Sequence, residues 1–338
     1  MGGDYAPAAT VAGAVLAARS LDATIVLVGD ERRIADELSK HDSAGGRLEI
    51  AHASQVIEMH ESPGAALRSK PEASMLVAAR MVAAGEADAV FSAGNSGAFM
   101  GAALLSIGTI EGVSRPAIAI AMPGKQGNVL LLDAGAVSDC RPKHLVQFAR
   151  MGAVYAERVM RLPRPRVALL NIGEEPAKGN ELTKAAYEAL SATDLNFVGN
   201  VEGTNLLAGA ADVAVCDGFV GNIVLKLLEG WADLFVTLLQ QELAQLAPAL
   251  RDDPGLAQAL QGLRRRVDYA EYGGAPLLGV KGIVVFSHGR SSPKAVCAAI
   301  GVAKEAVENG VVEGVASALR DRAAAAQTES RVADPGQD

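Results

Sequence analysis

The stretch that decides the fold is residues 87–110, ADAVFSAGNSGAFMGAALLSIGTI. A short apolar run, 87–91, leads into a glycine-containing loop and then into an uncharged helical pattern that ends near Ile110. This order is typical of a buried strand that turns sharply into a buried helix. The helical part begins only at about Gly97, whereas a membrane span needs about 20 mostly apolar residues. We therefore predict a strand–loop–helix unit inside a globular protein.

The same arrangement recurs along the 338-residue chain. Each apolar run ends in a loop with glycine or polar residues. The runs are 24–28, 47–51, 87–91, 129–132, 167–170, 213–215 and 282–286. Because they are apolar on both faces and alternate with helical patterns, they predict an α/β fold, a largely parallel sheet with helices on both faces. Such sheets bind ligands beyond the carboxyl ends of their strands, so we expect the site in these loops.

The amino-acid composition excludes some classes of function. Half of the residues are apolar, and 31 Lys and Arg against 39 Asp and Glu leave a net charge of −8. An acidic chain with few aromatic residues is a poor candidate for binding nucleic acid, which requires a basic face. The cysteines, Cys140, Cys216 and Cys297, are far apart and favour neither a disulfide framework nor a zinc knuckle. With no signal-peptide pattern either, we expect a cytoplasmic protein.

Residues 222–267 have a different pattern. Apolar residues at helical spacing predict a helical hairpin with more apolar surface than one neighbour need cover. Homodimer packing is our preferred interpretation, and burial within the monomer is the alternative. We predict a single α/β catalytic unit, 1–326, in which the hairpin is a dimer or membrane element, followed by a disordered tail, 327–338.

Familiar catalytic signatures are missing. The chain has no G-x-S-x-G elbow and no G-x-x-x-x-G-K-[ST] loop, no G-x-G-x-x-G follows a strand, and the five histidines lack metal spacing. What remains is a set of loops rich in backbone N–H groups, with a few Lys, Asn and acidic side chains. Such loops can hold a phosphate-like anion without a metal or cofactor.

Nine segments, taken together, carry a family resemblance. They are 1–4 (MGGD), 92–97 (SAGNSG), 131–136 (LLDAGA), 170–175 (LNIGEE), 178–182 (KGNEL), 199–203 (GNVEG), 217–222 (DGFVGN), 272–279 (YGGAPLLG) and 288–289 (HG). In this order, over nearly the whole chain, they resemble the PlsX family, the phosphate acyltransferases of bacterial phospholipid synthesis. Any one of them alone would be a weak signal.

The resemblance implies a reaction in which acyl–acyl-carrier protein and inorganic phosphate give acyl phosphate and free carrier protein. The acyl phosphate would then supply a membrane glycerol-3-phosphate acyltransferase. The family also implies an isocitrate dehydrogenase/phosphotransacetylase-like fold, a homodimer and peripheral contact with the membrane. Because phosphate is already nucleophilic near neutral pH and a thiol leaving group has a pKa of about 8.5, we infer direct attack in a ternary complex.

We expect three side chains to act on the reacting groups. Lys178 would neutralise phosphate or the developing charge, or else be a solvated lysine. Asn222 would assist at a helix start, or only cap that helix. His288 would donate to the thioester oxygen, or be a structural histidine. For Cys216, we favour the interpretation as a small buried thiol over a role as a nucleophile.

The remaining candidates would bind phosphate or substrate. Residues 94–97 would form a phosphate nest or merely cap a helix, and carboxylates would orient Lys178, asparagine amides or backbone donors, since they repel phosphate. The set is Gly3, Asp4, Gly94, Asn95, Ser96, Gly97, Asp133, Gly135, Asn171, Gly173, Glu175, Gly179, Asn200, Glu202, Asp217, Gly218 and Gly221.

An acidic carrier protein needs a local basic patch on this acidic chain. The densest run is Arg264, Arg265 and Arg266, which could also be a solvated helix face, and Arg141 with Lys143 is a second candidate. The hairpin tip, 246–250, could touch lipid.

The chain departs from the family pattern in places. The family has a hydrophobic strand and an Asp-Ala pair before Met-Gly-Gly-Asp, so we expect a first strand to be missing, Met1 to be internal to a longer protein, and activity to be impaired without that strand. Val137 replaces Asn, Thr204-Asn205 replaces Arg-Asp, and Val220 replaces Thr. Two rival functions stay open: a phosphotransacetylase-like enzyme that uses acyl-coenzyme A, and a non-catalytic scaffold that binds carrier protein.

Overall fold

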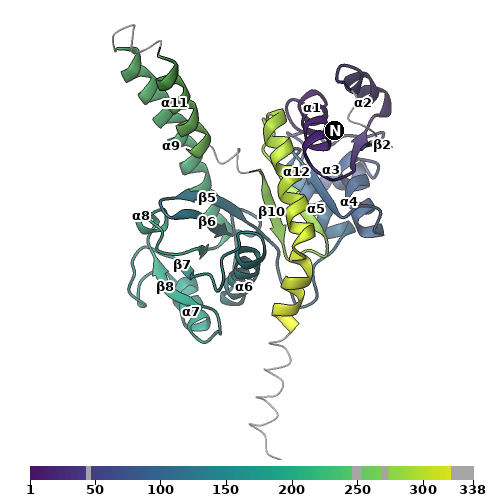
Figure 1. Cartoon of the computed structure of the whole chain (residues 1–338). Coiled ribbons are helices and arrows are strands. Elements are labelled where there is room, and N and C mark those ends of the chain that lie inside the picture. Colours follow the sequence, from purple (N-terminus) through teal and green to yellow (C-terminus); the bar gives the residue numbers. More distant parts are fainter. Residues whose placement is uncertain (43–46, 246–252, 268–272, 321–338) are drawn as a thin grey trace, which may run out of the picture.

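The computed structural model describes residues 1–42, 47–245, 253–267 and 273–320, whose strands form three sheets (Figure 1). The smallest is the parallel pair β1 (Ile25–Gly29) and β2 (Leu48–His52). The second has the order β3 (Ala89–Ser92), β11 (Ile283–Phe286), β10 (Ala275–Leu278), β4 (Ala117–Ile118). The third has the order β5 (Ile120–Gly124), β6 (Gly127–Leu132), β9 (Val213–Val215), β7 (Val167–Leu170), β8 (Phe197–Val201).

Strand directions confirm the α/β class and correct one detail. β3 pairs with β11 in parallel, and β6, β9, β7 and β8 are parallel to one another. β10, β4 and β5 pair antiparallel with their neighbours. The predicted single sheet is therefore divided, and the extended segment 117–124 passes from the second sheet into the third.

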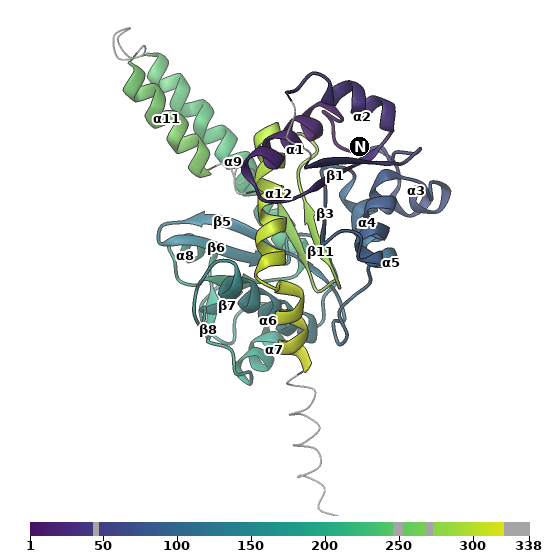
Figure 2. The ribbon, with the colours of Figure 1, turned by 45° about the vertical axis from the view of Figure 1, so that its right-hand side comes forward.

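Helices pack on both faces of the larger sheets (Figures 1 and 2). In the third sheet, Leu130 and Leu132 of β6 face one apolar cluster and Leu131 faces another. This burial on both sides explains why the strands read as continuous apolar runs. The helices of the described residues that pack around the sheets are α1 (Ala8–Ser20), α2 (Glu31–Leu38), α3 (Pro63–Ser69), α4 (Ser74–Ala84), α5 (Ser96–Ser106), α6 (Pro142–Arg158), α7 (Glu181–Ser191), α8 (Gly203–Leu206) and α12 (Pro293–Glu308).

The strand–loop–helix unit that decided the fold is confirmed. β3 leads into α5, whose Phe99 is fully buried and packs edge-on against Phe286 with ring centroids 5.0 Å apart. The helix ends earlier than the apolar pattern, at Ser106, and Gly108 follows with a φ of +77°. Glycine adopts that left-handed backbone without steric cost, so the chain can turn there although apolar residues continue.

The predicted hairpin projects away from the sheets (Figures 1 and 2). It consists of α9 (Gly218–Ala244) and α11 (Pro254–Val267), which lie side by side. Only the base of α9 packs on the third sheet, through partly buried Val224, Leu225 and Leu228. Leu227 is nevertheless 70% exposed and, further along α9, Trp231 is 57% exposed, so the alternative that the monomer buries this apolar surface is wrong. The tip, 246–250, and the tail, 327–338, lie outside the described residues.

The chain start lies against β1. The Met1 amino group donates a hydrogen bond to the Val28 carbonyl oxygen at 2.7 Å, and the Ser74 hydroxyl donates to the Met1 carbonyl oxygen. That a strand precedes Met1 stays a prediction, as does the division into a catalytic unit and a tail. Among the helices in the described part of the chain, none is both long and apolar enough to cross a bilayer.

Candidate active site

Most candidate residues follow strands whose carboxyl ends meet at the same edge. β6, β9, β7 and β8 are parallel neighbours, so the loops after them open on one side of the third sheet. β3 and β11 are likewise parallel in the second sheet. The candidates therefore fall into two groups, one at each sheet. Among the described residues no hydrogen bond joins the two groups.

Asp133 organises the loop after β6. Its side chain is completely buried, and its carboxylate accepts backbone N–H bonds from Ile118, Gly135, Ala136 and Val137 at 2.7–3.1 Å. Burial raises the pKa of this carboxyl group, and the four donors partly oppose the rise. Asp133 thus shapes a backbone loop and is withdrawn from solvent.

The start of α9 docks on this loop. The helix cap is Asp217, whose carboxylate accepts from the Val220 N–H at 2.9 Å, so the capping alternative for Asn222 is wrong. Asn222 lies in the second turn of α9, and a Cβ built on Gly135 would be 3.4 Å from the Asn222 Cβ. Asn222 is exposed and therefore free to meet a ligand at the loop.

Two glycines allow the close approach of α9 to the Asp133 loop. A Cβ on Gly221 would lie 1.8 Å from the Asp133 carbonyl oxygen, and one on Gly218 would lie 2.6 Å from the Asp133 carboxylate. Neither distance is possible for a real side chain. The spacing D-G-F-V-G-N thus reflects packing at 218 and 221 as well as helix capping at 217.

The loop after β7 is held by two asparagines. Asn171 donates from Nδ2 to the Lys178 carbonyl oxygen at 3.1 Å, and Asn200 donates from Nδ2 to the Glu175 carbonyl oxygen at 2.9 Å. The Oδ1 atom of Asn200 is buried with no hydrogen-bond partner among the described residues. Gly179 closes the loop with a φ of +94°. These contacts fix the backbone that carries Lys178.

Lys178 itself is exposed, and its stem lies over Gly173. A Cβ on Gly173 would be 2.9 Å from the Lys178 Cγ and 2.9 Å from the Glu175 carboxylate. The ammonium has no hydrogen bond or ion pair with a described residue, so it can meet an anion directly. Glu202, at the end of β8, caps α8 without a side-chain hydrogen bond.

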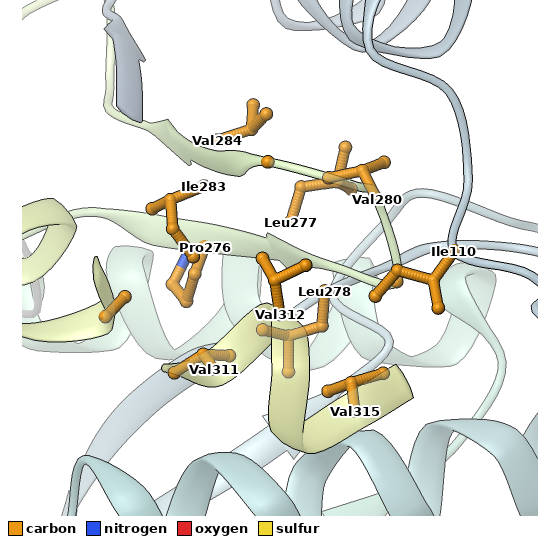
Figure 3. A pocket seen from close by; sticks show the side chains of 13 residues that line it. Ile110, Pro276, Leu277, Leu278, Val280, Ile283, Val284, Val311, Val312 and Val315 are labelled. Atoms are coloured by element: carbon orange, nitrogen blue, oxygen red, sulfur yellow. The ribbon is translucent and has the colours of Figure 1, made fainter. Parts of the chain in front are cut away.

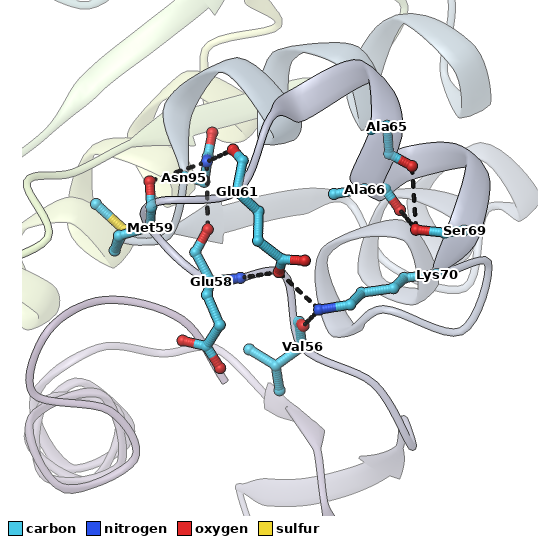
Figure 4. Close-up of polar contacts among 9 residues, drawn as sticks. All are labelled: Val56, Glu58, Met59, Glu61, Ala65, Ala66, Ser69, Lys70 and Asn95. Carbon is cyan, nitrogen blue, oxygen red and sulfur yellow. Dashed lines mark hydrogen bonds and ion pairs between the residues drawn. The ribbon is translucent and has the colours of Figure 1, made fainter.

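At the second sheet, both polar atoms of the Asn95 side chain are engaged in hydrogen bonds within the protein (Figure 4). Its Oδ1 accepts from the Ala98 N–H and caps α5, while its Nδ2 donates to the carbonyl oxygens of Glu58, Met59 and Glu61 at 2.9–3.3 Å. The capping alternative therefore describes this side chain. A phosphate nest at 94–97 stays a prediction that rests on the backbone N–H groups of Ser96 and Gly97.

Asn95→Ala is expected to lower the free energy of unfolding by roughly 2–4 kcal/mol, because it removes a helix cap and leaves three carbonyl groups without their donor. Urea unfolding measures the loss. The matched control is Asn180→Ala, which removes only the cap of α7 and should cost about 1 kcal/mol. Equal losses in the two variants would contradict the clamping role of the Asn95 amide.

The rest of this second group surrounds the chain start. The Asp4 N–H donates to the Gly289 carbonyl oxygen at 2.7 Å, and a Cβ on Gly3 would be 3.1 Å from that oxygen. His288 is exposed, and its Nδ1 accepts from the Arg290 N–H at 3.1 Å. The acceptor role of Nδ1 places the proton of the neutral ring on Nε2, which is the donor that the predicted role requires.

Two structural contacts had no signal in the sequence. The loop 58–61, which Asn95 holds, is 34–37 residues away from it in the chain. Asn205 donates to the Glu174 carboxylate at 2.7 Å, across a 31-residue separation. Only spatial proximity reveals either pair.

A small apolar gap beneath β10 and β11 is excluded as the substrate site (Figure 3). Its volume is about 10 Å³, and its lining includes Ile110, Leu278 and Val315. That volume holds about one water molecule at most, and the lining offers few polar partners. Within the described ranges, no group of three His, Cys, Asp or Glu side chains is placed to hold a metal ion.

Comparison with known proteins agrees with this arrangement. A family model described as "Fatty acid synthesis protein" matches residues 1–314. The phosphate acyltransferase of Desulforamulus reducens is 51% identical over 95% of this chain and 96% of its own length, and that of Moorella thermoacetica is 51% identical over 92% of each. Among solved structures, a phosphotransacetylase from Streptococcus pyogenes has a TM-score of 0.56 at 16% identity, covering 91% of each chain. A branched-chain phosphotransacylase from Enterococcus faecalis has a TM-score of 0.55 at 14% identity, covering 90% of this chain and 96% of its own.

The two kinds of likeness have different weight. The solved structures are too distant in sequence to indicate more than the fold, which is the phosphotransacetylase-like fold that the sequence predicted. The family match and the curated relatives cover almost the entire chain, including every loop described above. The chain therefore belongs to the PlsX family of fatty acid synthesis proteins, the phosphate acyltransferases, and is an acyltransferase.

Proposed function

We propose that this enzyme transfers a fatty acyl group from acyl–acyl-carrier protein to inorganic phosphate, giving acyl phosphate for phospholipid synthesis. The observation that carries the proposal is the loop 171–179, which asparagine side chains hold rigid and which presents the Lys178 ammonium to solvent. Family membership supplies phosphate as the acyl acceptor.

In the proposed step, a phosphate oxygen attacks the thioester carbonyl carbon within a ternary complex. A C–O bond forms, the C–S bond breaks, and the sulfur leaves as a thiolate that takes a proton from solvent. Lys178 would neutralise phosphate or the developing oxyanion, and Asn222 would donate from its amide beside the Asp133 loop. His288 would donate from Nε2 to the thioester oxygen, once the second sheet's loops meet the same substrate.

Burial of the Cys216 and Cys140 thiols supports direct attack by phosphate without an acyl-enzyme. Cys216 is buried, and burial together with Asp217 and Asp133 raises its thiol pKa well above the ordinary value. Burial is also the main cause that raises the pKa of Cys140 to about 12. A thiol that stays protonated near neutral pH is a poor nucleophile.

Iodoacetamide at pH 8 is expected to leave Cys140 and Cys216 unmodified in the folded protein and to alkylate both in urea. Only the thiolate reacts, and its fraction at pH 8 is negligible for a pKa of about 12. Peptide mass spectrometry reads each site. Rapid alkylation of Cys216 in the folded state would contradict this account, and an acylated Cys216 during turnover would overturn direct attack.

The decisive experiment incubates the enzyme with long-chain acyl–carrier protein and phosphate, and traps acyl phosphate with hydroxylamine. We expect hydroxamate that depends on phosphate, and none from acetyl-coenzyme A. Turnover of acetyl-coenzyme A instead would favour the phosphotransacetylase alternative. Carrier binding with no trapped product would favour the scaffold. Running the assay on this chain and on one extended upstream tests the expected first strand.

We further propose that the enzyme is a homodimer that pairs through α9. One face of that helix carries Phe219, Ile223, Leu227, Trp231, Leu234 and Leu238, which are 47–70% exposed. Their spacing of three or four residues places them in one continuous stripe. An exposed apolar stripe of this length marks an interaction surface, and a second copy presents an identical stripe.

Leu227→Glu is expected to convert a dimer to a monomer, because it places a carboxylate in the middle of the stripe. Light scattering after size exclusion measures the mass. The control, Gln240→Glu, adds the same charge on an exposed position of α9 away from the stripe and should leave the mass unchanged. A wild-type chain that is monomeric at micromolar concentration would contradict the proposal.

The remaining partners follow from the same proposal. The enzyme would work in the cytoplasm, with the hairpin allowing peripheral contact with the membrane, and would pass acyl phosphate to a glycerol-3-phosphate acyltransferase there. Arg264, Arg265 and Arg266 fall in the last turn of α11, although their side chains lie outside the described residues. Carrier docking at that run stays a prediction.

A further inference from the structure

We propose that a hollow at the start of α6 is a second oxyanion site, which binds a phosphate group. The hollow has a volume of about 580 Å³ and is lined by Arg115, Arg141, Lys143, His144 and Asp139, among others. It lies beyond the Asp133 loop along the chain and uses none of the residues assigned to the acyl transfer. The sequence singled out Arg141 and Lys143 only as a second candidate for carrier-protein docking.

His144 provides the observation that points to a ligand. The residue is 7% exposed, and its Nδ1 accepts a hydrogen bond from the Arg141 N–H at 3.2 Å. Because Nδ1 is an acceptor, the proton of the neutral ring sits on Nε2. That Nε2–H has no partner among the described residues, yet it is not sealed off as the Nε2 of His41 is. His144 also lines the hollow, so this unpartnered donor belongs to a largely buried side chain at its wall.

Charge in the hollow favours an anion. Arg115 and Lys143 are exposed, and neither has a hydrogen bond or ion pair with a described residue. Burial and the charges of Lys143, Arg115 and Arg141 together lower the pKa of His144, so the ring is neutral at pH 7 and the cations surround it. The carboxylate of Asp139 opposes only one of these three charges.

The position of the hollow at the start of a helix is a third feature that favours anion binding. The hollow lies at the N-terminus of the 17-residue helix α6, where the helix dipole favours negative charge. A phosphate group can accept from the His144 Nε2–H while its remaining oxygens meet Arg115 and Lys143. A carboxylate has fewer acceptor oxygens and would leave part of this donor set unpaired.

Two sources can supply the phosphate: the free ion, or a phosphate ester on a larger acyl donor. The test uses protein with ring-labelled histidine and follows the His144 signal by NMR at pH 7 and constant ionic strength. Inorganic phosphate and coenzyme A are titrated separately, with His41, His52 and His60, which have no part in the proposed acyl transfer, as internal references. Tighter binding of phosphate identifies a free-ion site, and tighter binding of coenzyme A identifies an ester site.

We expect a saturable shift of His144 that weakens at least tenfold in Arg115→Gln/Lys143→Gln. The matched control, Arg32→Gln/Lys281→Gln, removes the same charge from exposed positions elsewhere and should bind within twofold of the wild type. A His144 signal that neither probe moves, or equal weakening in both double variants, overturns the proposal. Binding is read without turnover, so failure here is distinct from failure of the proposed reaction.

Discussion

Lys178→Met is expected to lower kcat/KM for phosphate-dependent loss of acyl–carrier protein about 100- to 1000-fold. Removing one group that stabilises a developing oxyanion has an effect of this size in other acyl-transfer sites. The loop backbone should persist, because Asn171 and Asn200 hold it through main-chain carbonyl groups and not through the lysine side chain. The free energy of unfolding should therefore be unchanged within about 0.5 kcal/mol, as for other surface substitutions.

The control for this prediction is Lys184→Met, which removes an exposed lysine from α7, close to Lys178 in sequence. It should turn over at the wild-type rate, which separates a local role from a general loss of positive charge. If Lys178→Met retained more than a third of wild-type kcat/KM, Lys178 would have no part in charge stabilisation. The family assignment would be unaffected.

Gly221→Ala is expected to have the largest structural effect, a loss of about 3 kcal/mol or more in the free energy of unfolding and of most activity. The new methyl group would lie 1.8 Å from the Asp133 carbonyl oxygen, so α9 must move away from the loop. Overpacking of this kind typically costs 1–3 kcal/mol, and here the obstacle is backbone, which cannot rotate aside. Urea unfolding and the hydroxylamine assay measure the two losses.

Gly301→Ala is the matched control. Gly301 lies within α12, and nothing stands within 4 Å of its added Cβ. Alanine there should stabilise the protein by about 0.5–1 kcal/mol, because glycine is a poor helix former. Wild-type stability in Gly221→Ala would show that α9 does not need its close seat on the Asp133 loop.

The sequence was sufficient to predict seven of the described strands, β1, β2, β3, β6, β7, β9 and β11, because each is a short apolar run that ends in a polar or glycine-containing loop. It did not predict β4, β5, β8 and β10. It could not predict the division into three sheets. β4 is only Ala117–Ile118, too short for a periodic signal, and pairing of β3 with β11 joins residues nearly 200 positions apart. Pairings of that range depend on the packed chain and not on local pattern.

The sequence could not identify the cap of α9 for a similar reason. Asp217 and Asn222 are both good capping residues, and the apolar pattern begins between them. The close seat of Gly218 and Gly221 against Asp133 decides in favour of Asp217, and that contact spans more than 80 residues.

Backbone hydrogen bonds explain two departures from the family pattern. Val137 replaces asparagine, but residue 137 is used here through its backbone: its N–H donates to Asp133 and its carbonyl oxygen accepts from Gly218. Val220 likewise contributes its N–H to the Asp217 cap. Side-chain identity therefore matters less at these positions than the path of the main chain.

α9 is held at its first turn by the Asp133 loop, and this end acts as the pivot of a long lever. At 1.5 Å per residue its 27 residues extend about 40 Å, and Asn222 lies only about 6 Å from the pivot. A 5° swing would carry the far end about 3.5 Å but shift Asn222 by about 0.5 Å. The outer part of α9 can thus move to fit a contacting surface while the Asn222 amide near its base stays nearly in place.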